Sequence, residues 1–341
     1  MRVSLTPAVF LTTARNLELR DAPVPEPAAG EVLIRVTAVG LCGSDAHWYE
    51  HGKIGDASVE GSLILGHEFA GVIESGPRAG ERVAVDPAIP CEHCAYCRNG
   101  RANLCADLRF AGHGATDGAL RGRLTWPERC LVPLPEGLSD EEGALLEPLG
   151  VALHSIDLAS VDRSDSVGVF GAGPIGLLLV LALRAIGVEK VVVTDRLPHR
   201  LEAAMRVGAS HAILATEDEH EREAVADAAE AGLAVAFDCA GTDPALHSAL
   251  LSVRPGARVV LVGIPDRDRT SFLASVARRK ELLLALCRRM MPGDLARAAG
   301  LVESGSVDLG GLVTDRYPLT EADQAFRALS LRRGLKVLVE P

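Results

Sequence analysis

The sequence has few aromatic residues and few lysines. Aromatic residues make up 4% of its 341 residues, and only four of the 35 basic residues are lysine. The formal net charge is −11. Few side chains are available for base stacking, and the acidic excess repels phosphate groups. We therefore expect neither nucleic acid nor an anionic membrane surface as the main partner.

The sequence also lacks a membrane span and an export signal. Its longest apolar stretch, residues 175–185, is interrupted by Gly176 and Arg184 and is well short of the ~20 residues that cross a bilayer. The first residues contain neither the apolar core nor the cleavage site of a signal peptide. We expect a cytoplasmic protein without a membrane partner. In that reducing compartment, clustered cysteines bind metal more often than they form disulfides.

The composition suits a folded protein of about two domains. Hydrophobic residues make up 48% of the chain and charged residues 24%, which is sufficient for a core. Short apolar runs at 32–39, 69–75 and 82–85 predict that roughly the first 150 residues are β-rich. Strands and helices then alternate, which predicts an α/β fold with a doubly wound parallel sheet. The expected elements are strands at 167–170, 188–194, 235–239 and 258–262 and helices at 174–186 and 200–207.

A glycine-rich motif, GAGPIG, follows the first strand of the alternating region. Gly171 allows a tight turn, Gly173 allows close approach of a pyrophosphate, and Gly176 allows close packing of helix on strand. The helix then begins at Pro174 and Ile175, and its N-terminal amides and dipole favour an anion. The motif therefore predicts a dinucleotide site.

Charged residues downstream of the motif bear on the choice of cofactor. Asp195 lies nineteen residues after Gly176, at the end of the next predicted strand. A carboxylate at this position accepts hydrogen bonds from the adenosine ribose and repels a 2′-phosphate. Arg196 and Arg200 would instead attract such a phosphate. We predict NAD as the cofactor, with NADP less favoured.

Four cysteines lie within fifteen residues, at Cys91, Cys94, Cys97 and Cys105. Four thiolates can complete a tetrahedral shell around Zn²⁺ with no open position, so the predicted role of this site is structural. An iron–sulfur cluster, which begins with a similar spacing, is the alternative. His93 lies inside the loop and is not expected to be a ligand.

Further candidate metal ligands are dispersed along the chain: Cys42, His67, Glu68 and Glu147. Each is ordinary alone, because a single cysteine is commonly a core residue and a His-Glu pair commonly makes a surface hydrogen bond. Together with the four-cysteine loop and a nucleotide fold, they indicate a second metal site. The remaining cysteines, Cys130, Cys239 and Cys287, are expected in the core.

These motifs, in this order along essentially the whole chain, resemble the zinc-dependent medium-chain dehydrogenases. Within that family the chain is most similar to the sorbitol/xylitol (polyol) dehydrogenase branch. The segments that carry the resemblance are GLCGSDAHWYEHGKIGD (40–56), LGHEFAG (65–71), the four-cysteine loop, EEGALLEPLGVALHS (141–155) and GAGPIG (171–176).

The resemblance implies a discontinuous catalytic domain. Residues 1–152 and 287–341 would form a GroES-like, β-rich catalytic domain that includes the structural zinc lobe, residues 91–105. Residues 153–286 would form the Rossmann NAD-binding domain. The resemblance also implies a homotetramer, or a dimer, paired through an edge of the Rossmann sheet at residues 258–263.

The resemblance further implies two zinc ions per chain, one catalytic and one structural. Cys42, His67 and Glu68 would bind the catalytic ion. Glu147 would hold the water on that ion or act as an alternate ligand, and the alcohol dehydrogenase branch has a cysteine at the matching position. Ser44 and His47 would relay the released proton to solvent, for which the near-neutral pKa of histidine is suited.

The implied reaction is hydride transfer from a secondary hydroxyl of a polyol to NAD, which yields a ketose. The residues that match the wall of the substrate cleft are Trp48, Phe110, Glu147 and Arg288. L-Threonine, 2,3-butanediol and sugar acids such as idonate are alternative substrates. A catalytically inactive, NAD-binding regulatory protein is the alternative of another class. Asp45 is expected to be a local hydrogen-bond acceptor and not a catalyst.

Overall fold

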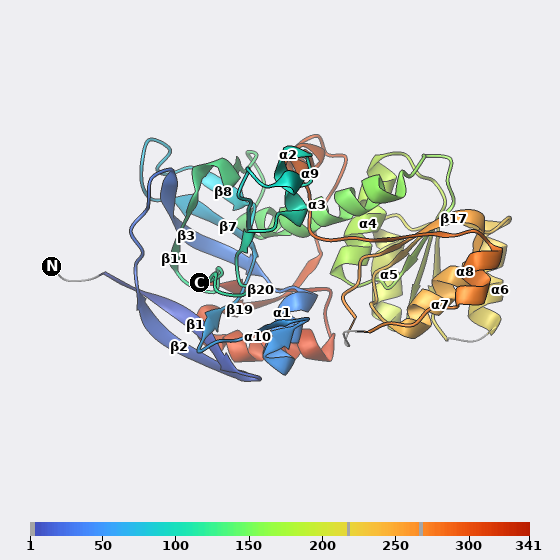
Figure 1. The fold of residues 1–341 in the computed structure, drawn as a ribbon, viewed down its shortest axis with the longest axis horizontal. Helices are drawn as coiled ribbons and strands as arrows, with labels where there is room; N and C mark the ends of the chain where they lie inside the picture. The colour runs from blue at the N-terminus through green and yellow to red at the C-terminus, as the bar shows by residue number, and fades with distance from the viewer. Residues whose placement is uncertain (1–3, 217–218, 266–268) are drawn as a thin grey trace. The chain divides into compact units, whose positions relative to one another are not determined.

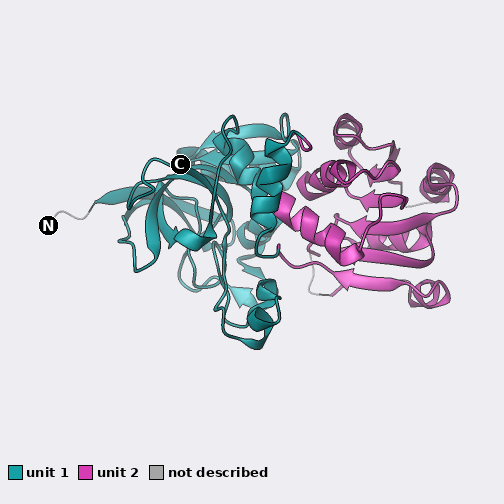
Figure 2. Ribbon diagram, turned by 90° about the horizontal axis from the view of Figure 1, so that it is seen from above, with its two compact units in different colours: residues 1–147, 291–305, 309–341 teal, residues 148–290, 306–308 magenta. Residues whose placement is uncertain are grey.

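The computed structural model describes residues 4–216, 219–265 and 269–341. The chain divides into two compact units, shown in two colours in Figure 2. Unit 1 comprises residues 1–147, 291–305 and 309–341, and unit 2 comprises residues 148–290 and 306–308. The chain therefore leaves unit 1, builds unit 2 and returns to finish unit 1. The helix α3 (Asp140–Ala159) contains the first crossing between the two units.

Unit 1 is built on a seven-stranded sheet in the order β12-β8-β7-β3-β20-β19, with β11 also paired to β3. Its strands are β3 (Glu31–Gly40), β7 (Glu68–Ile73), β8 (Arg82–Val85), β11 (Arg123–Pro127), β12 (Leu131–Pro133), β19 (Val313–Pro318) and β20 (Lys336–Glu340). The strand β20 pairs antiparallel with the C-terminal end of β3, a strand that comes early in the chain. Both strands are labelled in Figure 1. This pairing fixes the end of the chain in the sheet that carries the site.

Alternation of side chains explains why β3 forms a strand with one face in the core. Val32, Ile34 and Val36 are buried, whereas the intervening Leu33 and Arg35 are more exposed. The large side chains of Phe69 and Phe326 join the same core.

Smaller elements complete unit 1. A second sheet has the order β2-β1-β6, and two short pairs, β4 with β5 and β9 with β10, lie in the loops. The strand bounds are β1 (Leu5–Thr13), β2 (Asn16–Pro23), β4 (Lys53–Ile54), β5 (Ala57–Ser58), β6 (Leu63–Ile64), β9 (Ala88–Ile89) and β10 (Arg109–Phe110). The helices are α1 (Gly43–His51), α2 (Ala95–Arg98), α9 (Asp294–Glu303) and α10 (Ala322–Leu331), with short 3₁₀ turns η1 (Ala102–Leu104), η2 (Glu128–Cys130) and η3 (Leu319–Glu321).

Unit 2 contains a six-stranded, all-parallel sheet in the order β15-β14-β13-β16-β17-β18. Its strands are β13 (Val167–Phe170), β14 (Val191–Asp195), β15 (His211–Leu214), β16 (Leu233–Asp238), β17 (Val253–Leu261) and β18 (Leu283–Leu286). Its helices are α4 (Pro174–Ala185), α5 (Pro198–Arg206), α6 (Glu219–Ala229), α7 (Asp243–Ser252) and α8 (Ala274–Arg279). In chain order this is the 3-2-1-4-5-6 arrangement of doubly wound dinucleotide folds, so the predicted α/β class is confirmed.

One sequence-based expectation about this sheet is wrong. Residues 258–263 were expected at its edge, but β17 lies between β16 and β18. The edge beyond β17 is β18, because the chain adds a further strand after α8, and β15 forms the opposite edge. Within the described ranges, no helix has the length and apolar character needed to cross a bilayer.

Candidate functional site

Strand pairing in unit 1 brings together residues that are distant in sequence. Gly40, at the end of β3, pairs with Glu68 of β7 and also faces β20. Continuing both antiparallel registers by two residues places Cys42 opposite Gly66 on one side and opposite Lys336 on the other. The sheet itself therefore assembles the site.

Cys42, His67 and Glu68 form a compact group of possible metal ligands. One ligand atom from each lies within 4.8 Å of the others. His67 and Glu68 are buried, and Cys42 is partly buried. A thiolate, an imidazole and a carboxylate are donors that Zn²⁺ accepts, and three protein ligands leave a position for a further molecule. The group therefore fits a catalytic zinc ion.

Asp45 supports this group through hydrogen bonds, and the sequence led us to expect such an acceptor. Its fully buried carboxylate accepts the amide N–H groups of Cys42, at 2.9 Å, and Gly66, at 3.3 Å. Its Oδ1 also lies 3.5 Å from Nδ1 of His67. Burial by itself would lower the pKa of His67, but the charges of Asp45 and Cys42 raise that pKa well above its usual value. The contact of Nδ1 with Asp45 orients the imidazole and leaves Nε2 for a metal, which would take the place of a proton there.

Lys336 is a functional candidate that the sequence did not reveal. Its Nζ forms a buried salt bridge with Oε2 of Glu68. Gly40 makes room for the pair, because a Cβ at that position would lie 2.5 Å from Oε2 of Glu68 and 2.9 Å from Cε of Lys336. One signal in the sequence could have indicated this role. Lys336 is one of only four lysines, and it begins the apolar run KVLV.

Glu147 lies on α3 and is 5% exposed. Burial, together with the charges of Glu68 and Asp86, raises the pKa of Glu147 to about 8, although His67 opposes the shift. The charges of His67 and Glu68 thus affect the pKa of Glu147, although Glu147 does not belong to the compact group of ligands. Without a metal ion in the site, a carboxyl with this pKa keeps its proton at neutral pH, and a nearby cation would favour its ionised form.

The predicted relay residues lie on one helix. Ser44 and His47 are partly buried on α1, and their spacing of three residues places them on the same side of the helix. The imidazole of His47 lies near that of His51, with 6.1 Å between ring centroids.

The predicted substrate residues have different surroundings. Trp48 is 2% exposed, and its ring meets His113 edge-on at 5.5 Å between centroids. The ring of Phe110 lies 5.3 Å from that of His67. Arg288 is exposed in unit 2.

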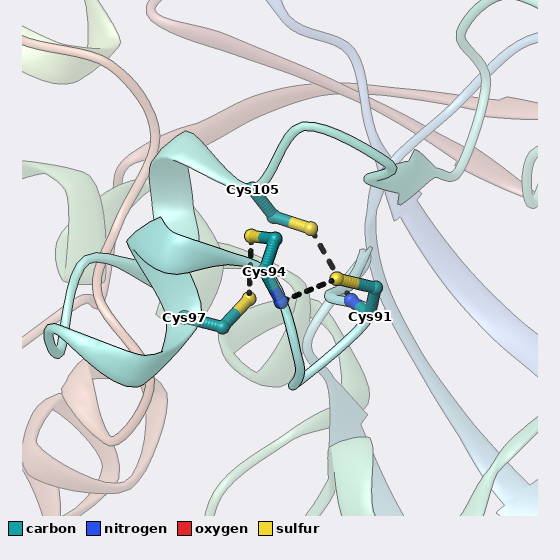
Figure 3. A group of neighbouring side chains, drawn as sticks. All are labelled: Cys91, Cys94, Cys97 and Cys105. Atoms are coloured by element: carbon teal, nitrogen blue, oxygen red, sulfur yellow. Dashed lines mark hydrogen bonds between the residues drawn. The ribbon is translucent and has the colours of Figure 1, made fainter.

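The four-cysteine loop connects the paired strands β9 and β10, and its four sulfur atoms point toward one another (Figure 3). All four lie within 4.8 Å of each other. The amide of Cys91 donates to Sγ of Cys105 at 3.2 Å, and that of Cys94 donates to Sγ of Cys91 at 3.4 Å. Backbone N–H groups of Cys97 and Ala106 lower the pKa of the Cys94 thiol to about 6. Four converging thiols with amide support fit a closed zinc site.

The dinucleotide motif in unit 2 has the expected turn. Gly171 has φ 107°, and a Cβ there would lie 2.8 Å from the amide nitrogen of Ala240. A Cβ at Gly176 would collide with the carbonyl oxygen of Gly171. Gly173 precedes α4, which begins with Pro174 and Ile175. The close backbone approaches explain the glycine requirement.

Asp195 is fixed at the end of β14. Its Oδ2 accepts the N–H of Ala172 at 2.7 Å, and its Oδ1 accepts that of Leu197 at 2.8 Å. The carboxylate is therefore held against the glycine-rich loop, where its remaining lone pairs fit a ribose diol. Arg196 is exposed, and Nη1 of Arg200 would lie 3.5 Å from a Cβ at Gly173. This part of unit 2 fits a dinucleotide.

The remaining cysteines were expected in the core, and only Cys130 lies there, at 7% exposed. Cys239 and Cys287 are only partly buried, because each follows the C-terminal end of a strand, β16 and β18 respectively. The Ser155 hydroxyl donates to Sγ of Cys287 at 3.2 Å.

The two units and their sites define a two-domain dehydrogenase. A family model described as an alcohol dehydrogenase GroES-like domain matches residues 28–136, and a model described as a zinc-binding dehydrogenase matches residues 174–304. The chain belongs to the zinc-binding dehydrogenase family. The GroES-like and Rossmann architecture predicted from the sequence is thereby confirmed.

Individual relatives align with nearly the whole chain. A probable D-xylulose reductase A of Aspergillus fumigatus is 37% identical over 95% of this chain and 93% of its own length. The sorbitol dehydrogenase of Bacillus subtilis is 36% identical over 98% of this chain and 97% of its own. A short chain alcohol dehydrogenase from Escherichia coli CFT073, crystallised with NADH, has a TM-score of 0.90 and 28% identity over 99% of this chain and 100% of its own.

Proposed function

We propose that this protein is a zinc- and NAD-dependent polyol dehydrogenase that oxidises a secondary hydroxyl of a sorbitol- or xylitol-like substrate to a ketose. One observation carries the proposal: beside the compact Cys42–His67–Glu68 group, the carboxyl of Glu147 is buried and close enough for the charges of His67 and Glu68 to shift its pKa. The relatives named D-xylulose reductase and sorbitol dehydrogenase support the same substrate class.

Each residue of the site has a distinct task in this proposal. Cys42, His67 and Glu68 hold the catalytic zinc, which supplies a Lewis acid that lowers the pKa of a substrate hydroxyl. Asp45 keeps His67 in the orientation suited to a ligand. Lys336 balances the charge of Glu68 in the protein interior. A second zinc, held by the four cysteines of the loop, stabilises the lobe.

Glu147 and the relay residues handle protons. The carboxyl of Glu147 can accept a hydrogen bond from one substrate hydroxyl and, when protonated, can also donate one to the next. Adjacent hydroxyls are the feature that distinguishes a polyol from a simple alcohol. Ser44 and His47 carry the hydroxyl proton toward solvent. The substrate carbon loses a hydride to NAD⁺, so that ketose, NADH and one proton are the products.

NAD is the proposed cofactor because of Asp195. Its carboxylate, held by the amides of Ala172 and Leu197, carries a negative charge at the place where NADP would bring a 2′-phosphate. Arg196 and Arg200 would favour NADP and reduce this preference.

A substrate panel tests the proposal. Initial rates are measured with xylitol, sorbitol, L-threonine, 2,3-butanediol and L-idonate, each with NAD and with NADP, and zinc is counted on the same sample. We expect the highest kcat/KM for a polyol with NAD and two zinc ions per chain. Superior turnover of threonine, the diol or idonate would contradict the polyol assignment. NAD binding without turnover of any alcohol would indicate a regulatory protein.

Variants locate the chemistry. Cys42→Ala and His67→Ala should abolish NAD reduction while the circular dichroism spectrum is retained, because each removes a zinc ligand. Cys287→Ser, at a partly exposed cysteine outside the metal groups, is the matched control and should retain activity. Full activity of the Cys42 or His67 variant would exclude the catalytic assignment.

We further propose a homo-oligomer, a tetramer or a dimer, that pairs through β18. Leu283 and Leu286 on this edge strand are 66% and 74% exposed, and an unpaired edge strand can pair with the same strand of a second copy. Leu286→Lys should reduce the mass measured by light scattering. The control Leu331→Lys, at a position 58% exposed on α10, should not.

The cytoplasmic location is also a proposal, supported by eight cysteines that are all free.

A further inference from the structure

The four-cysteine loop poses a problem of metal entry. Four thiolates fill the tetrahedral sphere of Zn²⁺ and leave no open position. Each thiol must also lose its proton before it can bind. An ion therefore enters or leaves this site only if other donors hold it while thiolates are exchanged one at a time.

A second group of donors overlaps the loop. Cys91, His93 and Asp107 each offer a ligand atom, and these atoms lie within 4.8 Å of one another. His93 and Asp107 are exposed, and Cys91 is partly buried. Cys91 thus belongs to both groups: the closed one shown in Figure 3 and an open one that faces solvent.

The backbone explains why these residues meet. Ile89 of β9 pairs with Arg109 of β10 in an antiparallel register. Continuing that register by two residues places Cys91 opposite Asp107.

A local turn adds the third donor. Glu92 has φ 64°, which turns the chain back so that Nδ1 of His93 lies 2.6 Å from the carbonyl oxygen of Cys91. A carbonyl oxygen only accepts, so Nδ1 carries the proton and Nε2 keeps the lone pair that a metal requires.

We propose that Cys91, His93 and Asp107 form an entry site that receives a hydrated zinc ion and passes it to the four-cysteine shell. This inference rests on the proposed structural zinc. Nitrogen and oxygen donors bind Zn²⁺ well, and three protein ligands leave one position for water, so an ion held there can still exchange. Cys91 keeps the ion throughout.

Transfer then replaces one donor at a time. Sγ of Cys94, Cys97 and Cys105 would take the positions of water, His93 and Asp107, and each incoming thiol would release its proton to solvent. The oxidation state of zinc would not change. His93 and Asp107 would be available again after the transfer. Removal of zinc follows the same steps in reverse.

Cadmium exchange into the full-length, zinc-loaded protein tests this inference. Added ¹¹³Cd²⁺ is followed by cadmium NMR, in which a four-sulfur site resonates apart from sites with nitrogen or oxygen donors. In the double variant His93→Gln/Asp107→Asn, we expect the four-sulfur signal to grow about tenfold more slowly, equivalent to about 1.4 kcal/mol of barrier. The final zinc content of the variant should equal that of the parent protein.

Glu92→Gln is the matched control. Glu92 is an exposed acid in the same loop, but its carboxylate pairs with Arg129 at 2.9 Å. This variant should exchange at the parental rate. An unchanged rate in the double variant, or an equal slowing by Glu92→Gln, would overturn the entry site. Absence of any four-sulfur signal in the parent protein would overturn the structural zinc itself, and the two failures are therefore distinguishable.

Discussion

Lys336 and Glu68 form a salt bridge in which both side chains are 2% exposed. The two residues are 268 positions apart and meet because β20 and β7 flank the same strand, β3. Two opposite charges in the interior are tolerated only as a pair, because each alone would pay the full cost of leaving water. The C-terminal strand therefore contributes directly to the candidate zinc site.

Lys336→Met should destabilise unit 1 by about 3–5 kcal/mol, since it leaves the carboxylate of Glu68 buried and uncompensated. Urea unfolding of the zinc-free protein measures this loss. The double variant Lys336→Met/Glu68→Gln should recover much of it, because no unpaired charge remains. A Lys336→Met variant as stable as the parent would show that the pair makes no such contribution.

The sequence was sufficient to predict the four central strands of the unit 2 sheet, for a physical reason. Strands buried on both faces are continuous apolar runs, and β13 was predicted with its observed bounds, Val167–Phe170. The glycine motif then marked the turn and the helix after it, α4, to within one residue. The two edge strands, β15 and β18, were not predicted, because each has only four residues and is exposed at both of its ends.

The two metal groups differ in how far apart their residues lie in the sequence. The four-cysteine loop is local, so its spacing alone predicted that the sulfur atoms would converge. Cys42 and His67 are joined by the register of β3 with β7, and nothing local reveals that contact. Lys336 was missed because its partner is distant in sequence and a single lysine is most often a surface residue.

Metal removal should affect the four-cysteine loop in particular. Between residues 91 and 105, which the structure describes in full, only Asn103 and Cys105 are buried, and α2 contributes no buried side chain, so the metal more than a core should hold this loop. After chelation, proteolysis should cut within residues 91–105, whereas zinc readdition should restore resistance. Equal resistance of the metal-free and metal-loaded proteins would contradict a stabilising metal.

Asp195→Asn should weaken the preference for NAD over NADP. The change removes the charge that would repel a 2′-phosphate, while Arg196 and Arg200 remain. We expect the ratio of kcat/KM values for the two cofactors to fall by about tenfold, or about 1.4 kcal/mol. Adding Arg196→Ala should return part of the preference. An unchanged ratio in Asp195→Asn would mean that this carboxylate does not set the choice of cofactor.

Asp238 should make unit 2 less stable as the pH rises. Burial raises the pKa of Asp238 from 3.8 to about 6, although the N–H groups of Gly241 and Ala240 favour its charged form. The folded state thus binds the proton more tightly than the unfolded state. Its contribution to stability is present below pH 4 and is lost as the pH rises through 6.

Asp238→Asn should therefore match the parent protein near pH 4 and exceed its stability at pH 8, by at most about 3 kcal/mol. Asp243 provides a control of opposite sign, because hydrogen bonds from Ser271 and Thr270 lower its pKa to about 2. Its contribution is present above the unfolded pKa and is lost as the pH falls, so Asp243→Asn should be less stable than the parent at pH 8. Urea unfolding of the parent and both variants at the two pH values measures these differences. Parallel pH profiles for all three proteins would show that neither carboxyl titrates differently in the folded state.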